Sequence, residues 1–250
     1  LEKTDALVCL TGMDEENIVV ALYAKAKKVS KVIAKINRIS FDEILDALDE
    51  TKTCIDMSTI DPSASIEIAE MVKKTGAGFI DAPVVKSKPA AIAGKLGIYV
   101  GGDEQTFEKM RRVLLYMGEN VVRMGDNGKG LVMKICHNAL VSQIQNGVNE
   151  TITLAQRNGI SVSAYAEAIS YGGGQNFYLD GKAAPIEKED YTTAFSVENM
   201  AKDVHICMEL AKECGLDMPG EQNACNVYDK ALELGYGKED FCATIKVVKG

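Results

Sequence analysis

The chain has 250 residues, of which 46% are hydrophobic, so it is long enough for one large globular domain or two small ones. Its 28 basic and 36 acidic residues give a net charge of −8, which argues against broad binding of nucleic acid or of anionic membranes. The sequence has no apolar run of about 18 residues, so no membrane span is expected. Its charged first residues do not resemble a signal peptide, and a cytoplasmic location is expected.

The cysteines also favour a reducing compartment. Their number, seven, is odd, and no two of them form a C-x-x-C pair. Most lie in apolar runs, so we expect buried free thiols rather than disulfides. With only two histidines and no paired spacing, a structural zinc site is not expected.

Strand and helix patterns alternate through the first half of the sequence. Short apolar runs predict strands at residues 5–10, 31–36, 53–57, 78–81, 96–100 and 120–124. The segments between them predict helices at residues 14–28, 41–49, 63–74 and 106–116. This alternation predicts an α/β domain with a mostly parallel sheet and helices on both faces.

Strand patterns stop at Gly128, and only helical patterns follow. They predict helices at residues 129–158, 163–170, 197–215 and 221–234. Glycines occupy the expected C-caps at 159, 215 and 235, and the serines at 163 and 196 are candidate N-caps. Residues 172–176, which include three glycines, are expected to form a flexible loop that borders a pocket. The second part is therefore expected to be all-helical and entered by one long helix.

The start of that long helix carries the strongest functional signal. A glycine-rich turn precedes it, and Lys134 and Asn138, four residues apart, share one helix face. Partial burial on this largely apolar helix would lower the pKa of the lysine toward neutrality and suit it to acid/base chemistry. Asn138 offers a donor and an acceptor beside it. The alternative is that both side chains are ordinary solvated surface residues.

Four motifs follow one another between residues 53 and 250. They occupy residues 56–62, 81–96 and 128–138, and the pair Lys202-Asp203. Together they resemble the β-hydroxyacid dehydrogenases, which include 3-hydroxyisobutyrate dehydrogenases and glyoxylate/succinic semialdehyde reductases. The resemblance implies a Rossmann-like domain followed by an all-helical domain. It also implies hydride transfer between NAD or NADP and a small 3-hydroxy acid or semialdehyde.

The resemblance further implies roles for individual residues. Lys134 would be the general acid/base and Asn138 would orient the substrate. Ser58 and Thr59 would lie near the substrate and the nicotinamide, or else simply cap the helix that follows. Lys202 would approach the nicotinamide with support from Asp203, or else the two would form a solvated helix face.

Two features depart from the family pattern. Where the substrate loop of the family carries a Ser-Gly pair, this chain has Val85 and Lys86, followed by Ser87. Lys86 or Ser87 would then replace the missing hydroxyl and amide donors, and the three residues are candidates for substrate binding. The sequence also lacks the G-x-G-x-x-G turn that binds the pyrophosphate.

Residues 1–50 resemble instead the second half of an RCK nucleotide-binding domain, from regulatory subunits of bacterial potassium uptake systems. In that resemblance Thr11 would lie near the bound nucleotide. We therefore expect three parts, residues 1–52, 53–124 and 125–250, in a hybrid of two Rossmann-like halves.

Three functions are consistent with this organisation. The chain is a dehydrogenase of this family, an inactive chimeric scaffold, or a nucleotide-binding regulator of potassium transport. The dehydrogenase accounts for most of the sequence. A homodimer is expected because the long helix has more apolar residues than one small domain covers.

Overall fold

The computed structural model describes residues 6–9, 31–34, 45–46 and 48–250. The chain divides into two compact units, one of Leu1–Lys52 and Lys74–Ala77, the other of Thr53–Lys73 and Gly78–Gly250. In the first unit, β1 (Ala6–Cys9) pairs in parallel with β2 (Lys31–Ala34), in agreement with the strands predicted there. Thr11 and the helix predicted at 14–28 lie outside the described residues, as does most of the helix predicted at 41–49.

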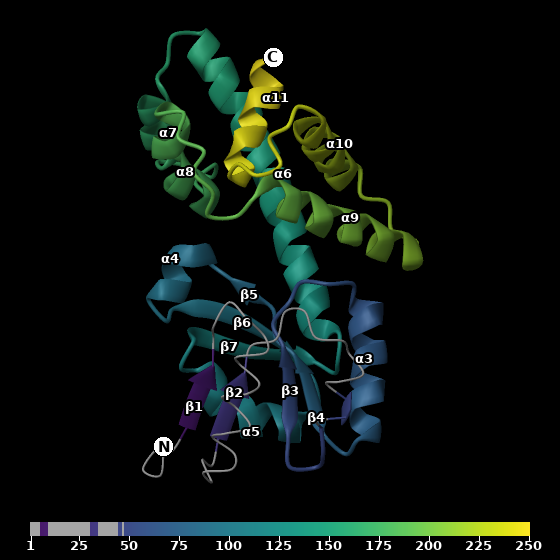
Figure 1. Cartoon of the computed structure of the whole chain (residues 1–250). Coiled ribbons are helices and arrows are strands. Elements are labelled where there is room, and N and C mark those ends of the chain that lie inside the picture. The colour runs from purple at the N-terminus through teal and green to yellow at the C-terminus, as the bar shows by residue number, and fades with distance from the viewer. Residues whose placement is uncertain (1–5, 10–30, 35–44, 47) are drawn as a thin grey trace. The chain divides into compact units, whose positions relative to one another are not determined.

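The second unit begins with a mixed sheet of strand order β3-β4-β6-β5, in which β7 also pairs with β6 (Figure 1). Its strands are β3 (Thr53–Asp56), β4 (Gly78–Asp81), β5 (Val84–Val85), β6 (Leu96–Gly101) and β7 (Gly118–Gly125). The pairs β3–β4 and β6–β7 are parallel, whereas β6 is antiparallel to β4 and β5. The expected α/β architecture is confirmed. The antiparallel reversal arises because α4 (Ser87–Ile92) is too short to form a crossover between parallel strands.

The core of the sheet is aliphatic and includes the fully buried Ile80, Ile98 and Val100. The helices α3 (Pro62–Lys74) and α5 (Glu104–Leu114) belong to this part of the unit, and Leu114 of α5 packs into the same cluster. Asp103 begins α5 by accepting a hydrogen bond from the backbone amide of Thr106 at 2.9 Å. Local capping and apolar spacing thus account for these elements.

Helices form the rest of the second unit (Figure 1). They are α6 (Lys129–Arg157), α7 (Val162–Ile169), α8 (Phe177–Glu187), α9 (Val197–Glu213), α10 (Pro219–Glu233), η1 (Phe241–Thr244) and α11 (Ile245–Lys249). The helices predicted at 129–158, 163–170, 197–215 and 221–234 are confirmed to within two residues. The sequence did not predict α8, because it contains Gly181 and Pro185, which normally interrupt helices.

The predicted helix caps are mostly confirmed. Gly159, Gly215 and Gly235 all have positive φ angles, and Ser196 caps α9. The prediction for α7 was wrong, since Ser161 rather than its neighbour two residues on accepts the amide of the first turn.

The expectation that the cysteines are buried holds for Cys207, Cys225 and Cys242, whereas Cys136 and Cys214 are exposed. Cys136 lies on the outer face of α6 beside the exposed Leu140, and Cys214 is the C-cap of α9, so neither faces the core. Within the described residues, no helix is long and apolar enough to cross a membrane.

Candidate active site

The beginning of α6 is fixed by a buried carboxylate that opens the motif at 81–96 but was not among the candidate site residues. Asp81, at the end of β4, accepts hydrogen bonds from the amides of Gly128, at 2.7 Å, and of Leu131, at 3.0 Å. The first amides of a helix have no partners within the helix, so a buried carboxylate there stabilises this end. Burial raises the pKa of Asp81, although these hydrogen bonds oppose the rise. The signal available in the sequence was an acidic residue at the end of the apolar strand predicted at 78–81.

Two glycines bring α6 against the sheet. A Cβ atom on Gly130 would lie 2.7 Å from the backbone nitrogen of Gly101 and the same distance from the carbonyl oxygen of Tyr99. Gly128, just before the helix, has a φ of 86°, which other residues rarely adopt. The glycines of the motif at 128–138 therefore allow the first turn of α6 to pack directly on β6, and so position Lys134 one turn further along.

Lys134 is buried, with 7% of its surface exposed, and its ammonium lies 5.9 Å from the centre of the Phe195 ring. Burial lowers the pKa of Lys134 from 10.5 to about 8, the charge of Asp203 partly opposes this, and that of Lys202 adds to it. The alternative of a solvated surface lysine is therefore wrong.

A chain of polar contacts connects Lys134 to α9. The ammonium donates to Oδ1 of Asn138 at 3.2 Å, and Nδ2 of Asn138 donates to Oδ2 of Asp203 at 2.6 Å. Oδ1 of Asp203 forms an ion pair with Nζ of Lys202 at 2.7 Å. Because Asp203 is only 1% exposed, Lys202 and Asp203 are not a solvated helix face, although Lys202 itself is 46% exposed. The carboxylate fixes the amide of Asn138 in one orientation beside the lysine.

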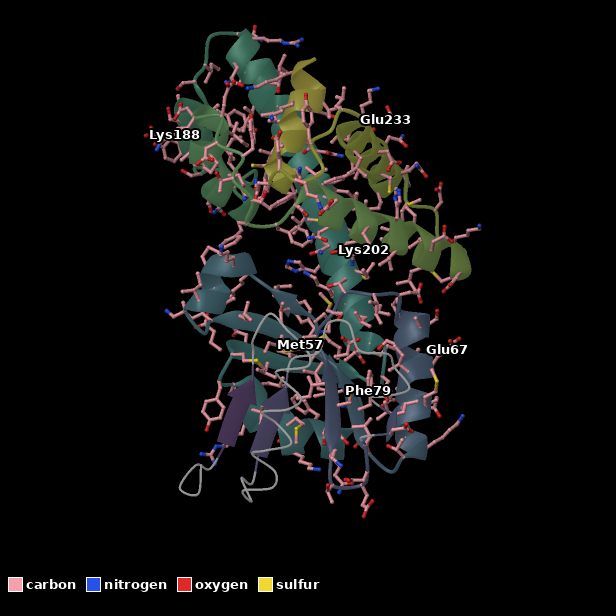
Figure 2. All side chains as sticks on the ribbon, viewed as in Figure 1. Met57, Glu67, Phe79, Lys188, Lys202 and Glu233 are labelled. Atoms are coloured by element: carbon pink, nitrogen blue, oxygen red, sulfur yellow. The ribbon has the colours of Figure 1, made fainter. Side chains whose placement is uncertain are left out.

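Lys202 also connects this chain to the sheet. Its ammonium, labelled in Figure 2, donates to the backbone oxygen of Thr59, which follows β3. The capping alternative for Ser58 and Thr59 is wrong, because Asp61 accepts the amides of the first turn of α3. Ser58 is exposed, with its amide on the Asp56 carboxylate, and Thr59 is half-buried.

The residues of the predicted substrate loop are arranged differently. Val85 is buried in β5 and packs over Gly97 of β6. Lys86 has a positive φ of 82°, and its ammonium forms an ion pair with Glu119 of β7 at 2.8 Å. The contacts of Lys86 thus lie outside the chain from Lys134 to Lys202. Ser87 begins α4, and its side chain lies outside the described part of the protein.

A second polar pair flanks Lys134 and was missed from the sequence. Nδ1 of His137 lies 3.2 Å from the hydroxyl oxygen of Tyr99, which belongs to β6. Burial, and then the positive charge of Lys134, lower the pKa of His137. The imidazole is therefore neutral at physiological pH and lies on the sheet side of the lysine. The sequence signal that could have identified His137 was its place within the motif at 128–138.

An α/β sheet, a helical part entered by one long helix and a buried lysine at the junction are the features of a dinucleotide-dependent oxidoreductase. The family model described as "NAD-binding of NADP-dependent 3-hydroxyisobutyrate dehydrogenase" matches residues 128–248. A second, described as "NAD binding domain of 6-phosphogluconate dehydrogenase", matches residues 8–125. The glyoxylate/succinic semialdehyde reductase 1 of Arabidopsis thaliana is 32% identical over 213 residues, which cover 84% of this chain and 74% of that protein. The chain belongs to the β-hydroxyacid dehydrogenase family.

Other relatives agree with this membership. The NAD-dependent L-serine dehydrogenase of Pseudomonas aeruginosa is 31% identical over 77% of this chain and 67% of its own length. The match to the structure of 3-hydroxyisobutyrate dehydrogenase from Mycobacterium tuberculosis with L-serine covers 99% of this chain and 100% of that chain, with a TM-score of 0.80 and 23% identity. That likeness supports the fold.

The comparisons do not show the RCK resemblance expected for residues 1–50. The family model that begins at residue 8 crosses the expected boundary at 52–53, so one NAD-binding domain of the dehydrogenase family describes both sides of it. The hybrid origin and the three-part division stay predictions.

Proposed function

We propose that the chain catalyses NAD(P)-dependent interconversion of a small 3-hydroxy acid and its semialdehyde, with Lys134 as the general acid/base. The observation that carries this proposal is a buried lysine whose pKa is lowered to about 8 and whose ammonium bonds to Asn138. At that pKa both protonation states are populated near neutral pH. The amine can accept the proton of a substrate hydroxyl, and the ammonium can return it to a carbonyl oxygen.

Asn138 supplies the orientation. One hydrogen of its amide is held by Asp203, so the other hydrogen and a lone pair of Oδ1 are directed beside the lysine. A substrate oxygen within reach of both side chains meets the proton donor and the amide together. Such positioning is a large part of catalysis because it removes the entropy cost of bringing the groups together.

The donors near the end of β3 fit the nicotinamide end of a dinucleotide. Ser58, Thr59 and the half-exposed ammonium of Lys202 gather where ligands bind in parallel sheets, beyond the carboxyl ends of the strands. We assign these residues, with Asp203 as the support of Lys202, to holding it. When bound, the nicotinamide supplies or accepts the hydride. Thr11 stays a candidate for the nucleotide end.

The direct test is a titration of the purified chain with NADH and with NADPH, followed by reduced-nicotinamide fluorescence and thermal shift. The wild type should bind the cofactor saturably and turn over a semialdehyde. Lys134→Ala should still bind the cofactor but lose turnover. Full turnover by Lys134→Ala would remove the assigned role. A flat titration with a cooperative melt would favour the inactive scaffold.

The substrate loop and the assembly complete the proposal. Val85, Lys86 and Ser87 stay candidates for substrate binding, and on this assignment substitution of Lys86 should change KM more than kcat. A homodimer buries the exposed apolar side chains Leu140 and Leu154 of α6. Analytical ultracentrifugation would reveal it, and a monomer at micromolar concentration would exclude it.

A further inference from the structure

The segment that precedes α9 carries the ring beside Lys134, and it is held by a different part of the chain. Phe195 is partly buried and packs at 6.0 Å, edge to face, on Phe241 of η1. One residue on, Ser196 caps α9 through the amide of Asn199. The position of this segment therefore determines both the cover over Lys134 and the start of the helix that carries Lys202 and Asp203.

Asp240 lies under this segment and is 1% exposed. Its Oδ2 accepts the backbone amides of Ala194, at 3.0 Å, and of Phe195, at 3.3 Å. Its Oδ1 accepts the ammonium of Lys182, at 2.7 Å, and the amide of Cys242, at 3.2 Å. Both oxygens therefore receive donors, and the ion pair with α8 compensates the buried charge. Burial raises the pKa of Asp240, but these donors outweigh it and hold the pKa below its ordinary value.

Backbone contacts strengthen the same connection. The amide of Asp240 donates to the carbonyl oxygen of Tyr191 at 2.9 Å, and that of Phe241 donates to the carbonyl oxygen of Phe195 at 2.8 Å. Phe195 is thus held at its amide by the carboxylate of Asp240 and at its carbonyl by the next residue. A displacement of that carboxylate would release the amide of Phe195, and with it the ring beside Lys134.

We propose that Asp240 is a positioning residue for the active site: its carboxylate, paired with Lys182, fixes Phe195 beside Lys134 and so keeps water from the lysine. This inference rests on the proposed function in one respect, that Lys134 is the acid/base. Asp240 itself acts only through the segment that it holds.

Two effects of losing Asp240 have opposite signs, which makes the proposal testable. Loss of a nearby negative charge lowers the pKa of a lysine, whereas loss of an apolar cover raises it toward 10.5. The charged groups that act on Lys134 are Asp203 and Lys202 from α9, and Asp240 is not among them. The ring at 5.9 Å is at the outer limit of a cation–π contact, so its removal lowers the pKa by less than the regained solvation raises it.

The experiment measures the pKa of Lys134 directly, without cofactor or substrate. Trace acetylation of the full chain at a series of pH values, read by peptide mass spectrometry, gives the titration midpoint of this amine. The wild type should titrate near 8. In Asp240→Asn, an NH2 group would face the amides and the ammonium that now donate to the carboxylate, so the segment would be released. The midpoint of Lys134 should then rise by about one unit. The matched control is Glu239→Gln, which removes the adjacent acid that pairs with Lys246, and should leave the midpoint unchanged.

A midpoint in Asp240→Asn equal to or below that of the wild type would overturn the proposal, whatever the loss of thermal stability. If that variant does not fold, Asp240→Glu keeps the charge opposite Lys182 but moves the oxygens, and the same rise is expected. An unchanged midpoint there would also overturn it. A wild-type midpoint near 10.5 would instead contradict the proposed acid/base role of Lys134, so the two failures are distinguishable.

Discussion

Glu221 in the first turn of α10 should make the stability of the protein depend on pH. It is fully buried, and its Oε2 accepts hydrogen bonds from the hydroxyl of Ser142, at 2.9 Å, and from the amide of Gln143, at 3.1 Å, both on α6. Burial raises its pKa from 4.5 to about 7, although these hydrogen bonds oppose the rise. The folded protein therefore holds this proton more tightly than the unfolded chain. Its contribution to stability is complete below pH 4.5 and is lost as the pH rises through about 7.

A rise from 4.5 to about 7 corresponds, at about 1.4 kcal/mol for each pH unit, to an upper limit of roughly 3 kcal/mol. Glu221→Gln keeps an oxygen for Ser142 and Gln143 and cannot ionise. We expect urea denaturation to give similar free energies of unfolding for both proteins at pH 4.5, and a variant more stable by up to about 3 kcal/mol at pH 8. The control is Glu233→Gln, an exposed acid of the same helix that pairs with Lys230. A stability difference that does not change with pH would refute the reasoning.

The further predictions concern residues of α6. Lys134→Met should lower turnover by about 10²- to 10⁴-fold with little loss of thermal stability, because an apolar side chain replaces a buried cation. In the wild type, the rate of hydroxy-acid oxidation should rise through pH 8, because the amine of Lys134 loses its proton there. Steady-state kinetics across pH and a thermal melt check both, and a pH-independent rate would contradict them. Gly130→Ala should destabilise the fold by about 1–3 kcal/mol because its Cβ would meet backbone atoms at 2.7 Å. Gly147→Ala, on the same helix with no atom within 4 Å of its Cβ, should instead stabilise it by up to about 1 kcal/mol in chemical denaturation.

Sequence periodicity and capping residues predicted the features that depend on residues close together in the sequence. The shared face of Lys134 and Asn138, four residues apart, follows from the helix repeat alone, and their hydrogen bond at 3.2 Å is the result. The same reasoning could not predict α8, because Gly181 and Pro185 disfavour a helix. This helix is stabilised by packing in the helical core rather than by the helix propensity of its residues. Ile186, near the end of α8, is fully buried in the helical core.

The partners of the buried polar groups could not be predicted, for a related reason. Lys134, Asn138 and Ser142 follow one another at intervals of four along α6, and such a stripe can be read from the sequence. Asp203 meets this stripe from 65 residues beyond Asn138, and Glu221 meets it from 79 residues beyond Ser142. The family resemblance marked Asp203 as a site residue but did not give Asn138 as its partner, and nothing in the local pattern around Glu221 distinguishes it from a solvated carboxylate.

Asp203 and Glu221, which meet this stripe of α6, differ in what they do to it. Asp203 has Lys202 as a counter-charge and accepts a hydrogen bond from the amide of Asn138, so it orders the site. Glu221 has only neutral donors from α6, and these only weakly oppose the rise of its pKa that burial causes. Glu221 therefore retains its proton up to near neutral pH. One turn of α6 therefore separates the contact of a buried carboxylate that pairs with a cation from that of one that has only neutral donors. Ionisation of Glu221 should strain the contact between α6 and α10 while leaving the contact between α6 and α9 intact.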